Sequence, residues 1–252
     1  MSYRLSAPSR TSDQPGAFAS LLPRGESLLV TADRDDADVR IGHPGAAGCQ
    51  QRSLTPGTTL LVCAGSRPAP LWGSGCRLHP AGSEPARMLA FHDHAMGVRR
   101  PPPEDRRLPV VLAAACDLRD PGATRQWVMT ALLGDDPAFR ATAAVLAGRE
   151  SYQLVRFVLE NPDLGVQQLA DRYGLSVAQF RRIGRKAFGR SLKEQLRLLR
   201  AGRVLHCHAD TGHTFTRLSS DFGFSSPSHF CSEIKSLLGR SPRSIFQSVN
   251  AS

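Results

Sequence analysis

The sequence lacks the features that mark several large classes of protein. Its six cysteines include no Cys-x-x-Cys pair and no regular spacing, so we expect free thiols in a reducing cytoplasm. No run of about 18 apolar residues occurs, and the first ten residues, MSYRLSAPSR, contain no apolar stretch of the signal-peptide kind. The chain is therefore expected to be cytoplasmic and not to span a membrane.

Motifs for common enzyme chemistry are also missing. The sequence has no Gly-x-Ser-x-Gly, no phosphate-binding loop, no His-Glu-x-x-His and no pair of carboxylates with an evident partner. We expect neither enzyme activity nor a cofactor. An enzyme would need its site within residues 25–97, and a pocket there with converging ionisable groups would favour that alternative.

Several histidines raise the question of a metal site. His92 and His94 flank Asp93, and imidazoles two residues apart on a β-strand lie on one face. Together with His43 and His79 they could supply ligands, but the sequence does not place the remaining ones. Polar residues at the end of a strand explain the same pattern, and we predict no metal.

Positive charge is concentrated in one part of the chain. The formal net charge is +10, and residues 148–252 contain 16 Lys and Arg against 8 Asp and Glu, whereas residues 1–147 contain 16 against 14. This distribution indicates a polyanionic partner, because neutralising phosphates releases counterions. A solvated basic surface is the simpler alternative.

Short apolar runs separated by glycine, proline and aspartate predict β-strands in the N-terminal part. We therefore expect a small β-rich domain over residues 25–97, preceded by a Ser-, Pro- and Gly-rich disordered tail over residues 1–24. The segment 98–107, VRRPPPEDRR, has three prolines and no apolar periodicity, which predicts a linker. The expected strands lie at residues 28–32, 39–41, 58–63 and 88–91.

Helix is expected from there to the C-terminus. Breaks at two Asp- and Gly-containing clusters predict a helical connecting region over residues 108–147, with helices at 108–115, 123–133 and 137–147. From Glu150 an apolar helical face predicts a helix that stops before Pro162. The expected fold class is α+β, with a β-rich N-terminal domain and an all-α C-terminal domain over residues 148–252.

Residues 166–189 follow a helix-turn-helix pattern. Ala170 is small where two helices would cross, Gly174 permits the positive φ of a tight turn, and Leu175 is placed to plug the core. Ser176 is placed to cap the second helix. A single pattern of this kind is a weak signal, because any pair of antiparallel helices can produce it.

A second copy about fifty residues later strengthens the prediction. Both copies end in Gly-Arg-Ser, where glycine ends one helix and serine caps the next. Residues 191–208 between them are expected to form one linker helix of roughly 27 Å, close to the roughly 34 Å between successive major-groove faces. One chain could therefore place both second helices in adjacent turns of the groove. In the second copy, the positions equivalent to the apolar, small and turn residues of the first helix-turn-helix pattern are Phe215, Leu218, Ser219, Gly223, Phe224 and Phe230, with one extra residue after the turn glycine.

These residues carry a resemblance to a known family. The segments GVQQLADRYGLSVAQFRRIGRKAFGRSLKEQLRLLRAGRVL and FTRLSSDFGFSSPSHFCSEIKSLLGRSPRSIF resemble the AraC-type DNA-binding domain over about residues 150–250. Within that family, SHFCSEIK followed closely by SPR is most similar to regulators of type III secretion and invasion genes. The resemblance implies a transcription activator that binds double-stranded promoter DNA and contacts RNA polymerase.

The resemblance implies two forms of signal input. Many members of the family sense a sugar or another small molecule through an N-terminal β-barrel, whereas the type III secretion group tends to require a secretion chaperone as co-activator. Residues 25–97 offer no clear ligand cage, so we expect the chaperone. A small-molecule sensor is the alternative and an architectural DNA-binding protein the third. The operator, the inducing signal and homodimerisation stay open.

The resemblance also places the DNA contacts. The arginine fork suits guanine O6 and N7, whereas serine and histidine read bases less well, so we expect the first recognition helix to supply most of the direct readout. The base-contacting positions fall on Ala178, Arg181 and Arg182 in the first recognition helix and on Ser228, His229 and Ser232 in the second. We expect phosphates to be held by Gln179, Arg185, Lys186, Arg190 and Lys235.

Two departures from the family pattern concern the helix-turn-helix units. Gly184 stands where the family usually has an aromatic residue, which costs roughly 1 kcal/mol of helix propensity and removes a core anchor. Ile183 or Phe188 could fill the gap. Ser219 and Ser220 make the first helix of the second unit more polar than is usual, so we expect it to orient its recognition helix less firmly.

Overall fold

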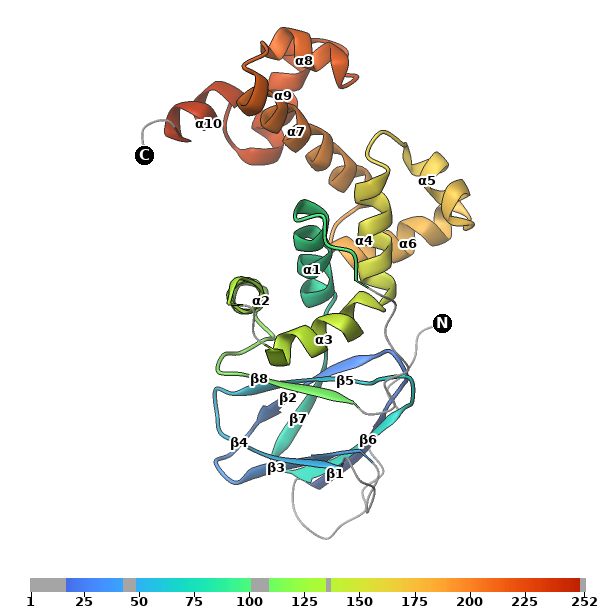
Figure 1. Cartoon of the computed structure of the whole chain (residues 1–252), viewed down its shortest axis with the longest axis vertical. Coiled ribbons are helices and arrows are strands. Elements are labelled where there is room, and N and C mark those ends of the chain that lie inside the picture. Colours follow the sequence, from blue (N-terminus) through green and yellow to red (C-terminus); the bar gives the residue numbers. More distant parts are fainter. Residues whose placement is uncertain (1–16, 43–48, 101–108, 135–136, 250–252) are drawn as a thin grey trace. The chain divides into compact units, whose positions relative to one another are not determined.

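The structure is a computed structural model that describes residues 17–42, 49–100, 109–134 and 137–249 (Figure 1). The chain divides into two compact units, Met1–Leu159 and Glu160–Ser252. Within the described residues, no helix is both long enough and apolar enough to cross a lipid bilayer.

Among its described residues, the first unit contains two four-stranded antiparallel sheets. Their strand orders are β1-β6-β3-β4 and β7-β2-β5-β8. The strands are β1 Ala17–Leu22, β2 Ser27–Ala32, β3 Ala37–Ile41, β4 Gln50–Leu54, β5 Thr59–Cys63, β6 Ala69–Ser74, β7 Cys76–Pro80 and β8 Val110–Ala114.

An apolar core lies between the two sheets. Alternate residues such as Leu28 and Val30 of β2 belong to this core, since successive side chains of a strand point to opposite faces. The residues between them are buried as well: Leu29 is 4% exposed, and Leu61 of β5 is fully buried. Helices therefore cover the outer face of this sheet, and α3 packs on β5 and β8 (Figure 1).

The helices of the first unit begin at recognisable start signals. Asp120 caps α2 by accepting a hydrogen bond from the Ala123 N–H at 2.7 Å, and Pro121 occupies its first turn. The last helix ends directly before Asn161 and Pro162, as the sequence predicts. The helices in the described part of this unit are α1 Glu84–Ala95, α2 Pro121–Leu133, α3 Pro137–Ala147 and α4 Glu150–Glu160.

The structure confirms three predicted strands of this region, β2, β3 and β5, and two predicted helices, α2 and α3. Two other predicted elements are wrong. Residues 88–91 lie in α1 rather than in a strand, because Glu84 and Pro85 in the first turn favour a helix start over the short apolar run. Residues 108–115 contain β8 rather than a helix. Its β-branched Val110 and Val111 suit the sheet edge beside β5.

The N-terminal tail and the linker are only partly described. The predicted disordered tail of residues 1–24 includes β1, which pairs with β6 and contributes Leu22 to the core, so the prediction is wrong for this strand. Residues 1–16 lie outside the described residues, as does the predicted linker 98–107 apart from its first three positions.

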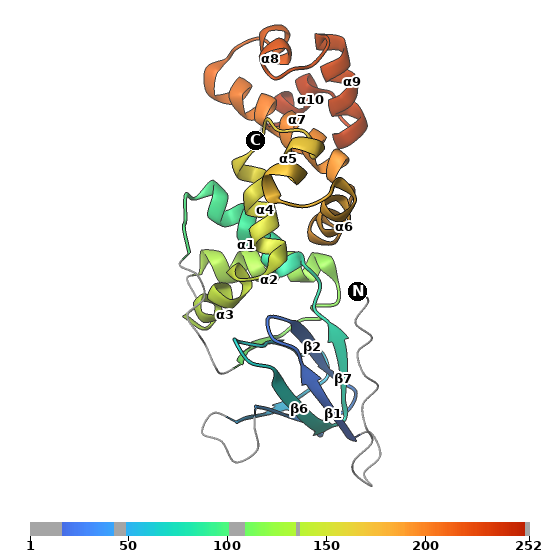
Figure 2. The ribbon, with the colours of Figure 1, turned by 90° about the vertical axis from the view of Figure 1, so that its right-hand side faces the viewer.

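The second unit is all helical, which confirms the predicted fold class (Figure 2). Two helix-turn-helix pairs, α5–α6 and α8–α9, are joined by α7, whose 20 residues span roughly 30 Å. The helices are α5 Val166–Tyr173, α6 Val177–Phe188, α7 Leu192–Thr211, α8 Phe215–Asp221, α9 Pro227–Leu238 and α10 Pro242–Val249.

Candidate nucleic-acid interface

The first helix-turn-helix pair has the predicted turn geometry. Gly174 ends α5 with a φ of 78°, a conformation that favours glycine, and the next residue, Leu175, donates its N–H to the Ala170 carbonyl at 3.0 Å. Ser176 caps α6 by accepting from the Gln179 N–H, and the Gln179 Oε1 accepts from the Ser176 hydroxyl at 2.9 Å. These contacts fix the direction in which α6 leaves the turn.

The second pair repeats this geometry. Gly223 has a φ of 71°, and the Phe224 N–H donates to the Ser219 carbonyl at 2.8 Å, the counterpart of the Leu175 bond. Ser226 caps α9 by accepting from the His229 N–H at 3.0 Å. Ser219, the predicted small residue, is fully buried and donates its hydroxyl to the Thr216 carbonyl. The two copies therefore share the positive-φ glycine, the backbone hydrogen bond that follows it and the serine cap.

The recognition helix α6 has one apolar face and one cationic face. The apolar face includes the buried Phe180, Ile183 and Phe188. The helix contains four cationic residues and no acidic residue. Exposed on the other face are Ala178, Gln179, Arg181, Arg182, Arg185 and Lys186.

Leu192 of α7 packs against the helix at Gly184. A Cβ placed on Gly184 would lie 3.5–3.6 Å from the Leu192 side chain, which is an ordinary van der Waals contact. Ile183 and Phe188, the two residues expected to fill the gap, are buried on the same helix. Where the family has an aromatic side chain on this helix, the present chain therefore has an apolar contact between Gly184 and Leu192 of the following helix.

Three arginines of α6 are not held by acidic side chains. Among the described residues, the side chains of Arg181, Arg182 and Arg185 have no hydrogen-bond or ion-pair partner. Arg190 pairs with Glu194 at 3.6 Å, but both side chains are about half exposed, so the pair contributes little free energy. The Gln179 carbonyl oxygen is occupied in the capping box, which leaves the amide NH₂ group to donate to a phosphate.

The recognition helix α9 presents a different surface. The predicted contacts Ser228, His229, Ser232 and Lys235 are exposed. The helix carries one lysine and one glutamate, so its formal charge is zero with His229 neutral. The cationic character of the candidate interface therefore comes mainly from α6.

Aromatic contacts hold the second pair on α7. Phe230 of α9 contacts Phe215 at 5.6 Å and Phe224 at 5.1 Å between ring centroids. Arg200 and Arg203 of α7 lie over the rings of Phe224 and Phe222 at 5.9 and 5.0 Å. The three-residue spacing of these arginines on a helix is the sequence signal that they share a face.

A buried carboxylate on α9 was also missed. The Glu233 side chain is only 7% exposed and accepts a hydrogen bond from the Arg197 Nε at 2.8 Å. The two residues lie on different helices, α9 and α7, so the sequence pattern within either helix gives no signal of their contact.

Among the described residues, the candidate ligands His79, His92 and His94 do not form a metal site. His92 and His94 lie on α1, where side chains two residues apart diverge by roughly 200°. Within the described residues, no three His, Cys, Asp or Glu side chains could jointly hold a metal ion. His43 lies outside those residues.

Asp93 instead forms a buried hydrogen-bond network. Its carboxylate accepts from Arg100 at 2.6 and 2.9 Å and from the Tyr152 hydroxyl at 2.9 Å. Burial alone would raise the pKa of Asp93, but hydrogen bonds from Arg100, His92 and Tyr152 outweigh it and hold the pKa below its usual value. Burial and the Asp93 carboxylate raise the pKa of Tyr152 to about 12. The network attaches α4 to α1.

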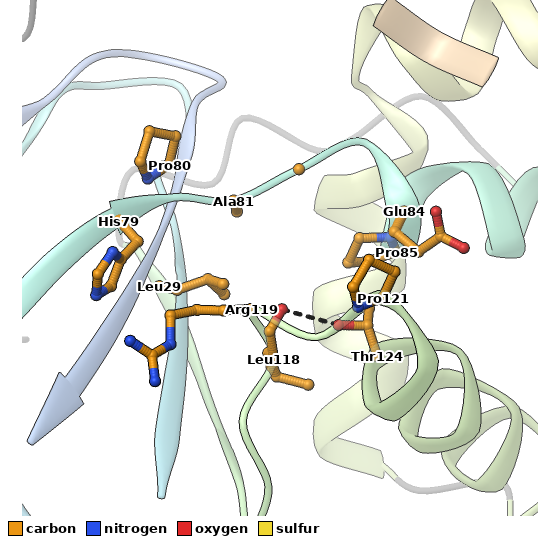
Figure 3. Close-up of a pocket in the computed structure, with 11 residues that line it drawn as sticks. Leu29, His79, Pro80, Ala81, Glu84, Pro85, Leu118, Arg119, Pro121 and Thr124 are labelled. Atoms are coloured by element: carbon orange, nitrogen blue, oxygen red, sulfur yellow. Dashed lines mark hydrogen bonds between the residues drawn. The ribbon is translucent and has the colours of Figure 1, made fainter. Parts of the chain in front are cut away.

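A pocket of about 350 Å³ lies in the first unit beside the starts of α1 and α2 (Figure 3). Figure 3 shows His79 and Arg119 at one end and Glu84 at the other. Each has a partner elsewhere: His79 with Thr31, Glu84 with Arg87 and Arg125, and Arg119 with Asp117. The ionisable side chains of the lining are therefore each held by a neighbouring residue. Most of its lining is apolar, from Leu29, Pro80, Ala81, Pro85, Leu118 and Pro121.

Comparison with known proteins identifies the class of the second unit. Residues 169–248 match a family model described as a helix-turn-helix domain, and the expected resemblance to AraC-type regulators is confirmed.

Two curated relatives resemble the chain more specifically. Invasion protein InvF of Salmonella typhi is 37% identical over 121 residues, covering 47% of this chain and 56% of that protein. Transcriptional regulator MxiE of Shigella flexneri is 33% identical over 137 residues, covering 51% and 65%. The chain thus matches between half and two thirds of the length of these relatives. The solved structure of ToxT from Vibrio cholerae aligns with 91% of the chain at 9% identity and a TM-score of 0.35.

Proposed function

We propose that the chain is a sequence-specific DNA-binding transcription activator that uses both helix-turn-helix units on promoter DNA and contacts RNA polymerase. The observation that supports this best is the exposure of all eleven predicted contact residues, on or directly beside α6 and α9. We assign DNA binding to residues 148–252, which carry the excess positive charge.

The two recognition helices have different tasks in this proposal. Arg181 and Arg182 of α6 read bases, since their guanidinium groups have no competing partner among the described residues. Arg185, Lys186, Arg190 and Lys235 hold phosphates and set the register. The length of α7, roughly 30 Å, supports binding of α6 and α9 in successive turns of the major groove.

An in vitro selection tests this function. The full-length chain is incubated with a random duplex library, and bound duplexes are sequenced over several rounds. We expect a motif with two parts separated by about one helical turn, roughly 10 base pairs. The Arg181→Ala/Arg182→Ala double variant is expected to lose information in one part only. A wild-type chain that enriches no motif would contradict the proposal.

The names of the relatives support a proposal about the target genes. One relative is named as an invasion protein and the other as a transcriptional regulator, so we propose that this chain activates type III secretion and virulence genes. A genome-wide map of bound sites in the native host tests the assignment. Bound promoters that lie upstream of secretion genes support it, and their absence from the map counts against it.

We further propose a type III secretion chaperone as co-activator. Affinity purification of the tagged full-length chain from the native host, followed by mass spectrometry, is expected to recover a small helical secretion chaperone. Repeated purification without one would contradict this part of the proposal. A variant with Asp93→Asn, which disturbs the network between α1 and α4, shows whether an intact first unit is needed for the interaction.

A regulator that senses a small molecule is the second candidate. The mainly apolar pocket of about 350 Å³ in the first unit favours it, because ligand pockets of this kind measure about 300–1,000 Å³. Replacing Ala81 of its lining with Trp is expected to abolish induction by such a ligand while leaving chaperone binding unchanged. Induction that survives this substitution would count against the second candidate.

A further inference from the structure

Glu233 is an unusual residue for the recognition helix α9. The neighbouring Cys231, Ser232 and Lys235 are exposed, whereas the Glu233 side chain is only 7% exposed. A buried carboxylate is costly unless other groups compensate its charge and its hydrogen bonds. Glu233 therefore needs partners that remain in place when the helix binds.

Its first partner fixes the helix. The Arg197 Nε donates to the Glu233 Oε1 at 2.8 Å, which joins α9 to the linker helix α7. Arg197 lies on α7 beside the aromatic contacts that dock the second pair, so the ion pair adds a directional contact to an otherwise apolar interface.

Its second partner is a predicted base-reading residue. The Glu233 Oε2 lies 3.5 Å from the Nε2 of His229, one turn earlier on the same helix. The His229 ring also contacts the Phe224 ring at 6.1 Å between centroids. Because the two carboxylate oxygens face different partners, one side chain connects the docking of α9 to the orientation of His229.

We propose that Glu233 is a positioning residue for DNA recognition by the second helix-turn-helix unit. It clamps α9 to α7 through Arg197 and holds the His229 imidazole in one orientation at the exposed face. This inference rests on the proposed function, namely that α9 enters the major groove. A preorganised side chain loses less conformational entropy when it contacts a base, so its position affects discrimination as well as affinity.

The test uses the full-length chain and the duplex that it selects from the random library. Dissociation constants are measured for that duplex and for its single-base-pair variants. The proteins are wild type, Glu233→Gln, His229→Ala and the double variant. Asp221→Asn is the matched control, since Asp221 is an exposed acid of α8 that pairs with Arg217 at 3.8 Å.

We expect Glu233→Gln to reduce discrimination by about tenfold at the base pair that His229→Ala affects, a ratio that corresponds to about 1.4 kcal/mol. The double variant should lose little more than either single variant, and base pairs read by α6 should keep their wild-type preference. A Glu233→Gln protein that discriminates like wild type, or that loses affinity equally for every duplex, overturns the inference.

A second variant covers the case in which Glu233→Gln does not fold. Arg197→Gln leaves the carboxylate and His229 in place but removes the clamp, and it should weaken all contacts of the second unit while sparing those of the first. Unchanged binding by this variant overturns the clamp. If the wild-type chain selects no motif, the proposed function fails. If the wild-type chain selects a motif but the Glu233 and Arg197 variants bind and discriminate like wild type, only this inference fails.

Discussion

Arg181 and Arg182 extend from a face of α6 that contains no acidic residue. Replacing either with Ala is expected to cost about 1–3 kcal/mol of binding free energy and to relax the preference at one base pair, because a bidentate contact to guanine is lost. Lys235→Ala should weaken binding evenly across sequences, since a phosphate contact carries no base information. Dissociation constants for single-base-pair variants of the selected duplex distinguish the two patterns.

Arg40 supplies the control for these substitutions. It is exposed on β3 of the first unit, far along the chain from either recognition helix, and Arg40→Ala should leave DNA binding unchanged. Equal losses for Arg181, Arg182 and Lys235 on every duplex would show that the base-reading assignment is wrong.

Tyr152 is expected to make the first unit less stable at alkaline pH. Its pKa is raised from 10.0 to about 12, first by burial and then by Asp93. A group with a raised folded-state pKa stabilises the fold below its unfolded value, and that contribution is lost as the pH rises from 10 toward 12. Between pH 10 and 12 we expect the free energy of unfolding of wild type to fall by roughly 1–2 kcal/mol more than that of Tyr152→Phe.

Chemical denaturation of the two proteins at several pH values measures this difference. Ser236→Ala, an uncharged change at an exposed position of α9 in the second unit, is the control and should retain the wild-type pH dependence. Asp93 affects stability at acidic pH. Because its pKa is lowered in the folded chain, the ionised carboxylate stabilises the fold above the unfolded-state pKa near 3.8, and this stabilisation is lost as the pH falls below that value. An alkaline loss of stability as large in Tyr152→Phe as in wild type would contradict the assignment.

What could be predicted for single residues depended on how far apart the interacting partners lie in sequence. The exposure of Arg181 and Arg182 follows from the spacing of apolar residues within one helix. The contacts of Glu233 and Tyr152 do not, because their partners lie 36 and 59 residues away on other elements. Such pairs depend on how helices cross, which periodicity within a helix does not specify.

Two glycines of the first helix-turn-helix pair should respond in opposite directions to alanine. Gly184 lies inside α6 with room for a Cβ beside Leu192, so Gly184→Ala is expected to stabilise the helix by about 1 kcal/mol. Gly174 has a φ of 78°, so Gly174→Ala is expected to cost about 1–2 kcal/mol from backbone strain, although the space around it is open. Hydrogen exchange of the α5 and α6 amides in the full chain measures both effects.

Hydrogen exchange also provides an internal control. The amides of β2 and β5 in the first unit should exchange as in wild type for both variants. Slower exchange of α6 in Gly174→Ala, or faster exchange in Gly184→Ala, would mean that the local conformations assigned to these glycines are wrong.

At the scale of elements, long periodic segments were predicted well and short apolar runs were not. The helix-turn-helix pairs are confirmed because turn glycines, capping serines and apolar spacing agree with one another. Residues 88–91 and 108–115 were assigned the wrong element type because a short apolar run fits a buried strand and a buried helix equally well. The deciding signals were the start residues Glu84 and Pro85 in one case and the paired valines of β8 in the other.

Along the whole chain, the charge is unevenly distributed between a nearly neutral N-terminal part and a strongly basic C-terminal part. Residues 1–147 have a net charge of +2 and residues 148–252 one of +8. This division was visible in the sequence because charge counts need no knowledge of the fold. The place of β8 in a sheet of the first unit was not, because it depends on pairing with β5, about fifty residues earlier.

The basic part should make DNA binding strongly dependent on salt. The four cations proposed to hold phosphates, Arg185, Lys186, Arg190 and Lys235, predict a slope of roughly −4 or steeper for the logarithm of the binding constant against the logarithm of salt concentration. Arg185→Ala should reduce the magnitude of this slope by about 1, since one fewer phosphate is neutralised. Ser236→Ala, an uncharged change at an exposed position of α9, should leave it unchanged. Titrations of the selected duplex at several salt concentrations give the slopes, and a flat response in wild type would contradict a phosphate-binding role for the second unit.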